Sequence, residues 1–271
     1  MEKIFYIQDL ECKYKGGDHS VLFIDELSIY KGEVVFIVGA SGIGKSTILE
    51  TLGLMNNTIV DNSKTKFSFV PELQEINYSN IWSKSENYLS DIRAKYFSFI
   101  FQDSTLFSHL SAYENVALPL LLNNKDDVSY NKESADKRTS SVFEKILEDF
   151  SSVSNDKGIN LMSGGQRQRV AFTRAMSSDF KVLFGDEPTG NLDPISAKKC
   201  MDLLISEMSK EKTVIIVSHD VSMALNYADR IIVIDKHGKK PNFYGKISNS
   251  LIFSKAENNF PTKEELMKLF I

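Results

Sequence analysis

The feature that most constrains this 271-residue chain is a glycine-rich stretch that directly follows a short apolar run. Residues 34–38 are Val-Val-Phe-Ile-Val, and residues 39–46 are Gly-Ala-Ser-Gly-Ile-Gly-Lys-Ser. A continuous apolar run of this length is typical of a buried parallel strand, and residues 47–54 continue with a helical pattern. A strand, a glycine loop and a helix in this order predict a phosphate-binding loop in an α/β fold.

The residue types in this loop indicate how it would hold phosphates. Glycines allow backbone angles that point successive N–H groups at phosphate oxygens, and the N-terminus of the following helix adds a favourable dipole. Lys45 can reach the β and γ phosphates of a nucleotide, and Ser46 can ligate Mg²⁺. The expected phosphate-binding residues are Gly39, Ala40, Ser41, Gly42, Ile43, Gly44, Lys45, Ser46 and Thr47.

Further apolar runs predict a mainly parallel sheet with helices between several of its strands. These runs occupy residues 4–10, 21–30, 97–101, 182–184, 214–217 and 231–234. Residues 56–87 are rich in Asn, Ser and Lys, which favours a loop-rich or antiparallel excursion, whereas residues 111–150 have the pattern of a helical subdomain. Near the end, residues 262–265 form a capping box, so we expect a short helix that docks on its own domain or, as the alternative, on a partner.

Composition indicates a globular protein, with 42% hydrophobic and 25% charged residues. The net charge of −4 argues against a dedicated nucleic-acid binder. Cys12 and Cys200 lie far apart without metal-ligand spacing, so buried reduced thiols are expected. The start lacks the pattern of a signal peptide, and no run has the length of a membrane span. We expect a cytoplasmic protein that reaches the membrane only through a partner.

A pair of carboxylates ends one of the predicted strands. After Lys181, residues 182–185 are apolar, and Asp186 and Glu187 follow. At the carboxyl edge of a parallel sheet, Asp186 would hold Mg²⁺ and Glu187 would polarise a water that attacks the γ phosphate. An acidic pair after a strand is just as often a solvated turn, so both interpretations stay open at this point.

A second glycine-containing segment begins another helix. Residues 162–166 are Met-Ser-Gly-Gly-Gln, and Ser163 is a good N-cap for a helix that includes residues 171–176. The Ser163 hydroxyl and the following amides would form a second anion site. One chain therefore carries two half-sites for phosphate.

In this arrangement the sequence resembles the ABC ATPases over about residues 1–236. The matching segments are Walker A at 39–46, the signature at 162–166, Walker B at 182–187, the D-loop at 191–193 and the switch at 218–220. The resemblance implies an ABC ATPase domain at 1–236 with an antiparallel β subdomain, a helical subdomain inserted at about 103–162, and a C-terminal tail at 237–271.

The resemblance also implies roles for individual residues. ATP and Mg²⁺ would bind between two copies in a head-to-tail dimer, so that the signature of one copy closes over the nucleotide held by Lys45 of the other. Tyr14 would stack on adenine, with a tyrosine packed at the end of an edge strand as the alternative. The catalytic residues would be Glu187, His219, Gln102 and Lys45, the metal ligands Ser46, Gln102 and Asp186, and the further nucleotide contacts Ser163, Gly164, Gly165, Gln166 and Asp193.

Two strings narrow the resemblance further. Residues 114–120 and 185–193 look like the lipoprotein-release, macrolide-efflux and cell-division ATPases, which work with four-helix permeases. The implied function is an ATP-hydrolysing subunit, peripheral on the inner face of the membrane, that drives a separate integral membrane permease. The alternative is an ATPase that transmits force or a signal without transport. The sequence departs from the family at Met162, which replaces Leu, at Gly185, which replaces Ala, and in the polar stretch 56–95.

The sequence also bears on a candidate docking groove and on two other classes of ATPase or GTPase. The apolar residues Phe107, Leu110, Tyr113 and Val116 could form a groove for a helix of the permease or the core of the helical subdomain. Residues 124–127 match the guanine-recognition pattern of small GTPases, but the required Asp-x-x-Gly occurs only at 235–238, which is too late in the chain. A chromosome-type ATPase would need long heptad repeats before the signature, and none are sustained there.

Overall fold

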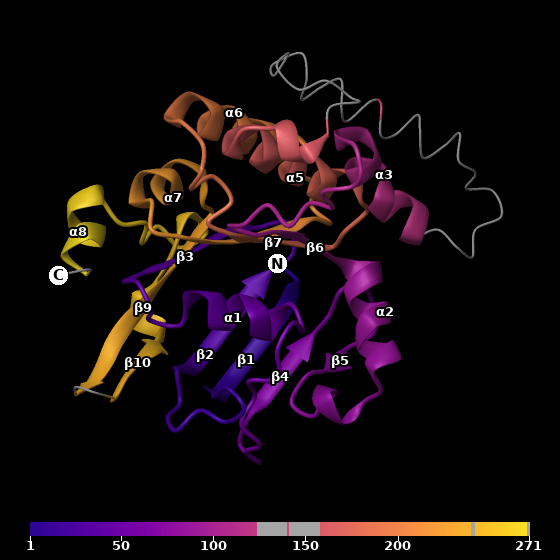
Figure 1. The fold of residues 1–271 in the computed structure, drawn as a ribbon. Coiled ribbons are helices and arrows are strands. Elements are labelled where there is room, and N and C mark those ends of the chain that lie inside the picture. The colour runs from indigo at the N-terminus through magenta and orange to yellow at the C-terminus, as the bar shows by residue number, and fades with distance from the viewer. Residues whose placement is uncertain (124–139, 141–157, 240–241, 270–271) are drawn as a thin grey trace. The chain divides into compact units, whose positions relative to one another are not determined.

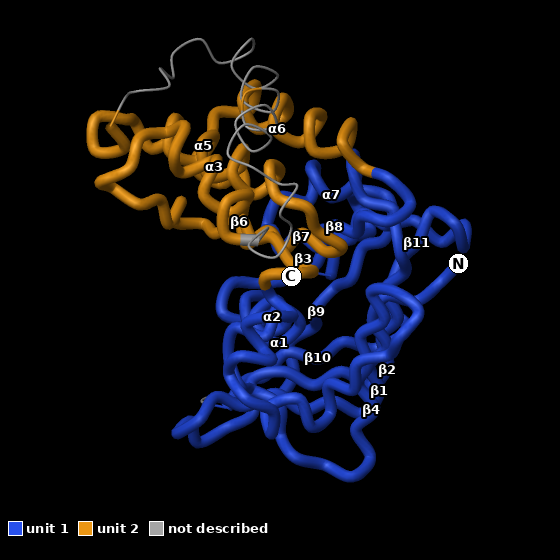
Figure 2. Tube along the Cα trace, turned by 90° about the vertical axis from the view of Figure 1, so that its right-hand side faces the viewer, with its two compact units in different colours: residues 1–93, 209–271 blue, residues 94–208 orange. Residues whose placement is uncertain are grey.

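A computed structural model describes residues 1–123, 140, 158–239 and 242–269. The chain divides into two compact units, unit 1 with residues 1–93 and 209–271, and unit 2 with residues 94–208 (Figure 2). The guanine-recognition pattern at 124–127 and most of the predicted helical stretch up to residue 150 lie outside the described residues. None of the described helices is both long and apolar enough to cross a bilayer.

Unit 1 is built on a mixed sheet with the strand order β5-β4-β1-β2-β10-β9-β3-β8 and with β11 paired to β9 (Figure 1). The strands β9, β3 and β8 are parallel, as are β2 and β10, and the other pairs are antiparallel. The strands are β1 (Lys3–Cys12), β2 (Leu22–Tyr30), β3 (Val34–Gly39), β4 (Lys66–Phe69), β5 (Ile76–Asn77), β8 (Thr213–Ser218), β9 (Arg230–Lys239), β10 (Asn242–Ile247) and β11 (Ile252–Ser254).

Burial explains why the parallel strands are continuous apolar runs. Every residue of β3 and of β8 is buried, as expected for central parallel strands that are covered on both faces. The helix α1 (Lys45–Leu52) packs against both strands, and α7 (Val221–Tyr227) packs against β3. The α/β fold class that the sequence predicts is confirmed.

The polar excursion after α1 contains the predicted antiparallel strands. β4 pairs with β1 and β5, and a cluster of aromatic rings covers this part of the sheet. The Phe5 and Phe69 rings stack with centroids 4.8 Å apart, and the Phe67 and Tyr78 rings are also 4.8 Å apart. Tyr78 is fully buried, and its hydroxyl donates a hydrogen bond to the Leu52 carbonyl oxygen at 3.3 Å. A few aromatic residues thus anchor an otherwise polar segment.

The C-terminal residues of unit 1 are more structured than their polar sequence suggests. β10 lies between β2 and β9, although the only residues of this strand that are buried are Gly245 and Ile247. The predicted short helix is α8 (Lys263–Lys268), and Thr262 and Glu265 form its capping box. α8 packs against α7, and its Leu266 is fully buried, so the helix docks on its own unit. The remaining short elements of unit 1 are η1 (Ile81–Ser83), η3 (Asn249–Leu251) and η4 (Lys255–Glu257).

Unit 2 pairs two parallel strands with helices. The strands β6 (Phe97–Ile100) and β7 (Val182–Asp186) are in register through Ile100 and Gly185. The helix α5 is joined to β6 by a hydrogen bond from the Ser98 hydroxyl to the Ala175 carbonyl oxygen at 2.8 Å. Among the described residues of this unit, the helices are α3 (Ala112–Asn123), η2 (Ile159–Leu161), α5 (Gly164–Ser177) and α6 (Pro194–Ser206), and α2 (Glu86–Tyr96) leads into it from unit 1.

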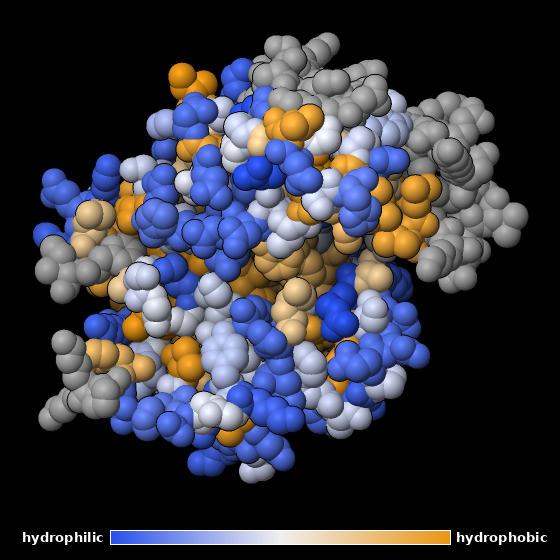
Figure 3. All heavy atoms as spheres, viewed as in Figure 1, coloured by the Kyte–Doolittle hydropathy of each residue, from blue (hydrophilic) through white to orange (hydrophobic). Residues whose placement is uncertain are grey.

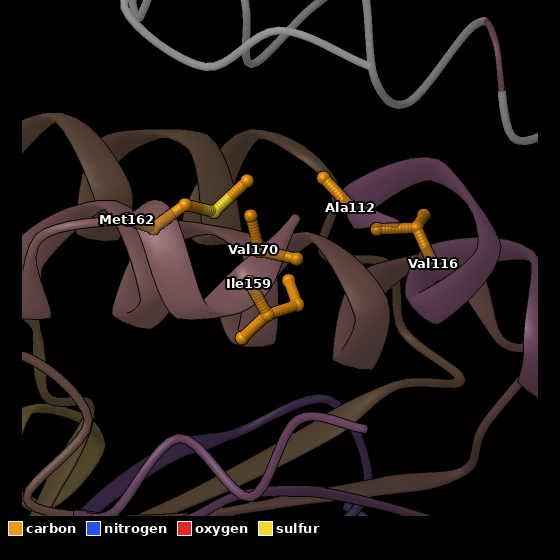
Figure 4. Close-up of a cluster of buried hydrophobic side chains, with 5 residues drawn as sticks. All are labelled: Ala112, Val116, Ile159, Met162 and Val170. Atoms are coloured by element: carbon orange, nitrogen blue, oxygen red, sulfur yellow. The ribbon is translucent and has the colours of Figure 1, made fainter. Parts of the chain in front are cut away.

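A small apolar cluster joins α3 to the start of α5 (Figure 4). Its members are Ala112, Val116, Ile159, Met162 and Val170. Val116 is fully buried there, so the structure assigns it to the core of unit 2 and not to an open groove. Tyr113 packs partly against the cluster, whereas Phe107 is 46% exposed. Met162 fills a buried position, which explains how it can replace leucine before the signature serine.

Hydrophilic residues cover most of the face shown in Figure 3. Among the described residues, the exposed large apolar side chains include Leu73 in unit 1 and Leu161, Leu121 and Leu122 in unit 2. Isolated exposed apolar side chains are ordinary on a protein surface.

Candidate nucleotide-binding and hydrolysis site

The glycine loop between β3 and α1 has the backbone that a phosphate-binding loop needs. Gly42 and Gly44 have φ values of 71° and 100°, a region in which residues with a side chain are strained. A Cβ built at Gly42 would meet no atom within 4 Å beyond its chain neighbours, so there is open space beside this residue. Gly44 is the N-cap of α1 and no side chain caps this helix, so its first N–H groups are available to an anion.

The other predicted loop residues divide into those that face solvent and those that pack. Lys45 turns back over the loop, where its Nζ donates hydrogen bonds to the carbonyl oxygens of Gly39 and Ala40 at 3.0 Å. Ser41 and Ser46 are exposed. The side chains of Ile43 and Thr47 are buried in unit 1, so these two residues can offer only their backbone N–H groups to a ligand.

Tyr14 lies beside α1 and is anchored to it. Its hydroxyl donates a hydrogen bond to Glu50 Oε2 at 2.8 Å and lies 3.1 Å from Thr47 Oγ1. Burial raises the pKa of Tyr14 to about 12, and the neighbouring Glu50 contributes to this increase. Tyr14 is therefore neutral near pH 7, and its ring is held next to the helix that begins at the glycine loop.

His219 comes directly after β8, the neighbour of β3. Because Val38 is paired with Ser218 in this parallel ladder, Gly39 and His219 follow at the same edge of the sheet. Asp220 is the N-cap of α7, and its backbone N–H donates to the Ser218 hydroxyl at 3.0 Å. The switch histidine is thus exposed between the end of a buried strand and a capped helix.

In unit 2, the parallel pair β6 and β7 brings Gln102, Asp186 and Glu187 to one edge. Glu187 has a φ of 46°, which a non-glycine residue rarely adopts. Its carbonyl oxygen accepts a hydrogen bond from the Gly190 backbone N–H at 3.0 Å, which closes a turn. Such backbone strain costs on the order of 1–3 kcal/mol and persists only where the surroundings hold it.

The signature segment forms the N-terminus of α5, as the sequence predicts. Ser163 is the N-cap, and its Oγ accepts a hydrogen bond from the Gln166 backbone N–H at 3.3 Å. The Gln166 side chain accepts in return from the Ser163 N–H at 3.0 Å, which completes a capping box. A side chain built at Gly164 would meet nothing within 4 Å, whereas Gly165 lies near Asn191 and Leu192.

Asp193, predicted to contact nucleotide, has a structural role that the sequence prediction did not include. It is the N-cap of α6, and its Oδ1 accepts hydrogen bonds from the N–H groups of Ile195 and Ser196 at 3.1 Å. The hydrogen bonds from Ser196 lower the pKa of Asp193. The Asp-Pro pair at the start of an apolar-periodic segment was a signal for this cap.

Two further residues of α5 bind the loops of unit 2 by hydrogen bonds. They were not predicted from the sequence. The Gln168 side chain donates hydrogen bonds to the carbonyl oxygens of Phe101 and Pro188. The Arg174 guanidinium donates to the Thr105 carbonyl oxygen at 3.0 Å. A polar residue on the apolar stripe that Ala171, Phe172 and Ala175 form was the available signal for Gln168.

The glycine loop with its uncapped helix and the carboxylates at the end of β7 define a P-loop nucleotide hydrolase. Comparison with known proteins refines this class. The ABC transporter family model matches residues 24–190. The phosphate import ATP-binding protein PstB of Malacoplasma penetrans is 32% identical over 98% of this chain and 82% of its own length. The chain belongs to the ABC transporter family, as an ABC-type ATPase, and the predicted family is confirmed.

Other relatives carry additional segments. The macrolide export ATP-binding/permease protein MacB of Haemophilus ducreyi is 34% identical over 86% of this chain, which spans only about a third of that relative, 31% of its length. A solved dimeric ATP-binding cassette, MJ0796 bound to ADP and Pi, aligns with a TM-score of 0.68 and 28% identity, covering 84% of this chain and 93% of the cassette. CbiO1 from Clostridium perfringens, with a TM-score of 0.72 at 24% identity, shares the fold; the alignment covers 99% of this chain and 94% of CbiO1.

Proposed function

We propose that this chain is the ATP-binding and ATP-hydrolysing subunit of an ABC transporter complex, and that two copies close head to tail around two ATP molecules to drive a membrane permease. The observation that carries the proposal is the pair of helix N-termini, one at the glycine loop before α1 and one at the signature before α5. Each of these N-termini can bind some of the phosphate groups of a nucleotide. The solved dimer of MJ0796 with ADP and Pi supports this arrangement.

Residues 39–47 would bind the phosphates of ATP, and Tyr14 would stack on its adenine. Glu187 would take the proton of the attacking water, while Gln102 orients that water and His219 contacts the γ phosphate. Ser46, Gln102 and Asp186 offer oxygen ligands of the kind that Mg²⁺ prefers. Mg²⁺, when bound, would offset the negative charge of the phosphates.

The second half-site would come from the other copy. The Ser163 hydroxyl is exposed, and the space at Gly164 is open, so donors at this end of α5 can approach an anion. If they reach the nucleotide only when two copies close, hydrolysis is coupled to that closure. Asp193, the last residue of the D-loop, would lie at the same contact.

Support for a permease partner comes from the relatives and from two sequence segments. MacB is named as an ATP-binding and permease protein, and CbiO1 as part of a transporter complex. The strings at 114–120 and 185–193 support a partner of the four-helix type. The chain would then lie on the cytoplasmic face of the membrane, attached through its permease.

Substitution of Glu187 tests the hydrolytic role. We expect Glu187→Gln to bind ATP with little change and to lose at least about a hundredfold in turnover, because a positioned general base contributes roughly 10²–10⁴-fold. Steady-state phosphate release and nucleotide binding measure the two quantities. Glu26→Gln, which changes an exposed carboxylate on β2, is the matched control. Turnover of Glu187→Gln near the wild-type rate would contradict the assignment.

Complementation tests the head-to-tail arrangement. Ser163→Arg and Lys45→Ala should each abolish ATP cleavage, the first without loss of ATP binding. In a mixed dimer, the Lys45 of one copy meets the Ser163 of the other, so one site is intact. We expect mixing to restore cleavage in a single-turnover assay at that site. Activity no higher than that of the separate variants would argue against the dimer.

Isolation of the complex tests the permease. Tagged Glu187→Gln protein purified with ATP from detergent-solubilised membranes should carry an integral membrane protein, which mass spectrometry would identify. A four-helix permease with a large outer domain supports the proposed group. A many-helix permease would indicate a different transporter type, and the absence of any membrane protein would contradict this part of the proposal.

A further inference from the structure

We propose that Gln168 is a positioning residue for ATP hydrolysis: it ties the signature helix to the two loops that carry Gln102 and Glu187. The inference rests on the proposed function, in which Glu187 is the general base. Gln168 lies in the second turn of α5 and is only 1% exposed. Its Nε2 donates hydrogen bonds to the carbonyl oxygen of Pro188 at 2.8 Å and to that of Phe101 at 3.3 Å.

The bond to Pro188 acts on the turn that contains Glu187. Glu187 holds a left-handed backbone with a φ of 46°, and Pro188 is the next residue. The same turn is closed at its other end by the bond from the Gly190 N–H to the Glu187 carbonyl oxygen. Two hydrogen bonds therefore restrain a backbone that is unfavourable by itself. Loss of one of them should let Glu187 move toward an ordinary conformation.

The bond to Phe101 acts on the other loop. Phe101 directly precedes Gln102, whose own carbonyl oxygen accepts a hydrogen bond from Asn191 Nδ2 at 3.0 Å. Farther along, Arg174 Nη1 on α5 donates to the Thr105 carbonyl oxygen at 3.0 Å. Gln168 is the side chain that connects this loop and the Glu187 turn to one helix.

An amide is suited to this task because its NH₂ group has two donors for two carbonyl oxygens. The Gln168 Oε1 is buried and has no hydrogen-bond partner among the described residues. An apolar residue of similar size would leave no such acceptor buried, so packing alone does not explain a glutamine here. The donors account for it.

The position of Gln168 also links it to the signature. Ser163 caps α5 five residues earlier, about 8 Å along the helix axis at 1.5 Å per residue. A displacement of the signature end of α5 would therefore reach both loops through the Gln168 side chain. In the proposed dimer, binding of the partner's nucleotide at Ser163 would therefore change the position of Glu187.

The test compares Gln168→Met, which keeps the side-chain length without the donors, with Ser177→Ala. Ser177 is a matched control because its buried hydroxyl also joins α5 to a backbone carbonyl, that of Val116 at 2.9 Å, but away from the two loops. We expect Gln168→Met to lower kcat roughly ten- to a hundredfold, since small misplacements of reacting groups can cost this much, with KM for ATP changed less than about twofold. Ser177→Ala should lose thermal stability and keep its kcat.

A double variant separates a positioning role from a general one. In the Glu187→Gln background, Gln168→Met should reduce the residual rate by a clearly smaller factor than in the wild type, because one of the two groups that it positions is already gone. The inference is overturned if Gln168→Met keeps its kcat and only melts earlier, or if it lowers the rate by the same factor in both backgrounds. The Glu187→Gln rate itself tests the proposed function separately, since full activity there would reject the general base whatever Gln168 does.

Discussion

Each unit has a helix N-terminus that we propose binds phosphate, but the two N-termini are held by different means. In unit 1 the glycine loop is shaped by its own residues: Gly42 and Gly44 take positive φ, and Lys45 donates hydrogen bonds to carbonyl oxygens of the same loop. In unit 2 the signature helix and its neighbouring loops are held by side chains such as Gln168 and by a small apolar cluster (Figure 4). The first arrangement is local, whereas the second depends on contacts between distant segments.

The two units also differ in the burial of two of their ion pairs. In unit 1, Arg230 forms a bidentate pair with Glu33, with both hydrogen bonds at 3.0 Å and side chains only 5% and 7% exposed. Arg230 also lies 3.4 Å from Glu257 in the C-terminal part of the chain. In unit 2, the pair of Lys198 and Asp202 is exposed on α6. Among the described residues, unit 1 thus has a buried ion pair beside more exposed ones such as Lys246 with Asp25, and the Lys198 pair of unit 2 is exposed.

The largest expected effect on stability tests this contrast. Arg230→Met should lower the free energy of unfolding by about 3–5 kcal/mol, because it leaves the Glu33 carboxylate buried without its partner. Lys198→Met should cost less than about 1 kcal/mol, since exposed pairs are screened by water. Urea denaturation of both variants measures the difference. Similar small losses would mean that the buried pair is not a structural element of unit 1.

A smaller effect is expected from the two capping boxes. Ser163→Ala in unit 2 and Thr262→Ala in unit 1 should each cost about 1 kcal/mol, because each removes the acceptor for a helix N–H group. Only Ser163→Ala should also lower ATP turnover, since only that cap lies in the proposed site. Denaturation curves and phosphate release distinguish these outcomes. Equal loss of turnover in both variants would indicate a general effect of stability on activity.

The smallest expected effect on stability comes from the two thiols, Cys12 and Cys200. Burial raises the pKa of Cys12 in unit 1 to about 11 and that of Cys200 in unit 2 to about 12. Both are free and buried, as predicted. At pH 8 the folded protein should therefore react with iodoacetamide far more slowly than the protein in urea. Rapid labelling of either thiol in the folded protein would show that its unit opens.

The same shifts give a pH dependence with a defined sign. Above the ordinary thiol pKa of about 8.5, the unfolded chain loses the proton that the folded chain keeps, so the folded state binds more protons. The contribution of Cys12 to stability is complete below this pH and is lost as pH rises toward 11. Cys12→Ala should flatten the alkaline loss of stability in this window. An unchanged slope would exclude the thiol as its cause.

Much of the fold could be predicted because it depends on nearby residues. The buried run of β3, the glycine loop, and the caps of α5 and α8 all follow from period, backbone angle or side-chain reach within a few positions. β10 was missed because it buries only Gly245 and Ile247, which leaves no alternating pattern. α2 was missed because its residues are polar, and only Leu89 and Ile92 are buried.

The sequence by itself determined which chemical groups this protein has and which local conformations they adopt. The tertiary structure decided which of them meet. Gln168 reaches carbonyl oxygens 67 and 20 positions away, and Arg230 reaches a carboxylate 197 positions away. Such contacts leave no periodic trace, because they depend on how strands and helices distant in the chain pack together. The glycine loop can thus be recognised in the sequence, while the hydrogen bonds that hold the Glu187 turn are seen only in the folded chain.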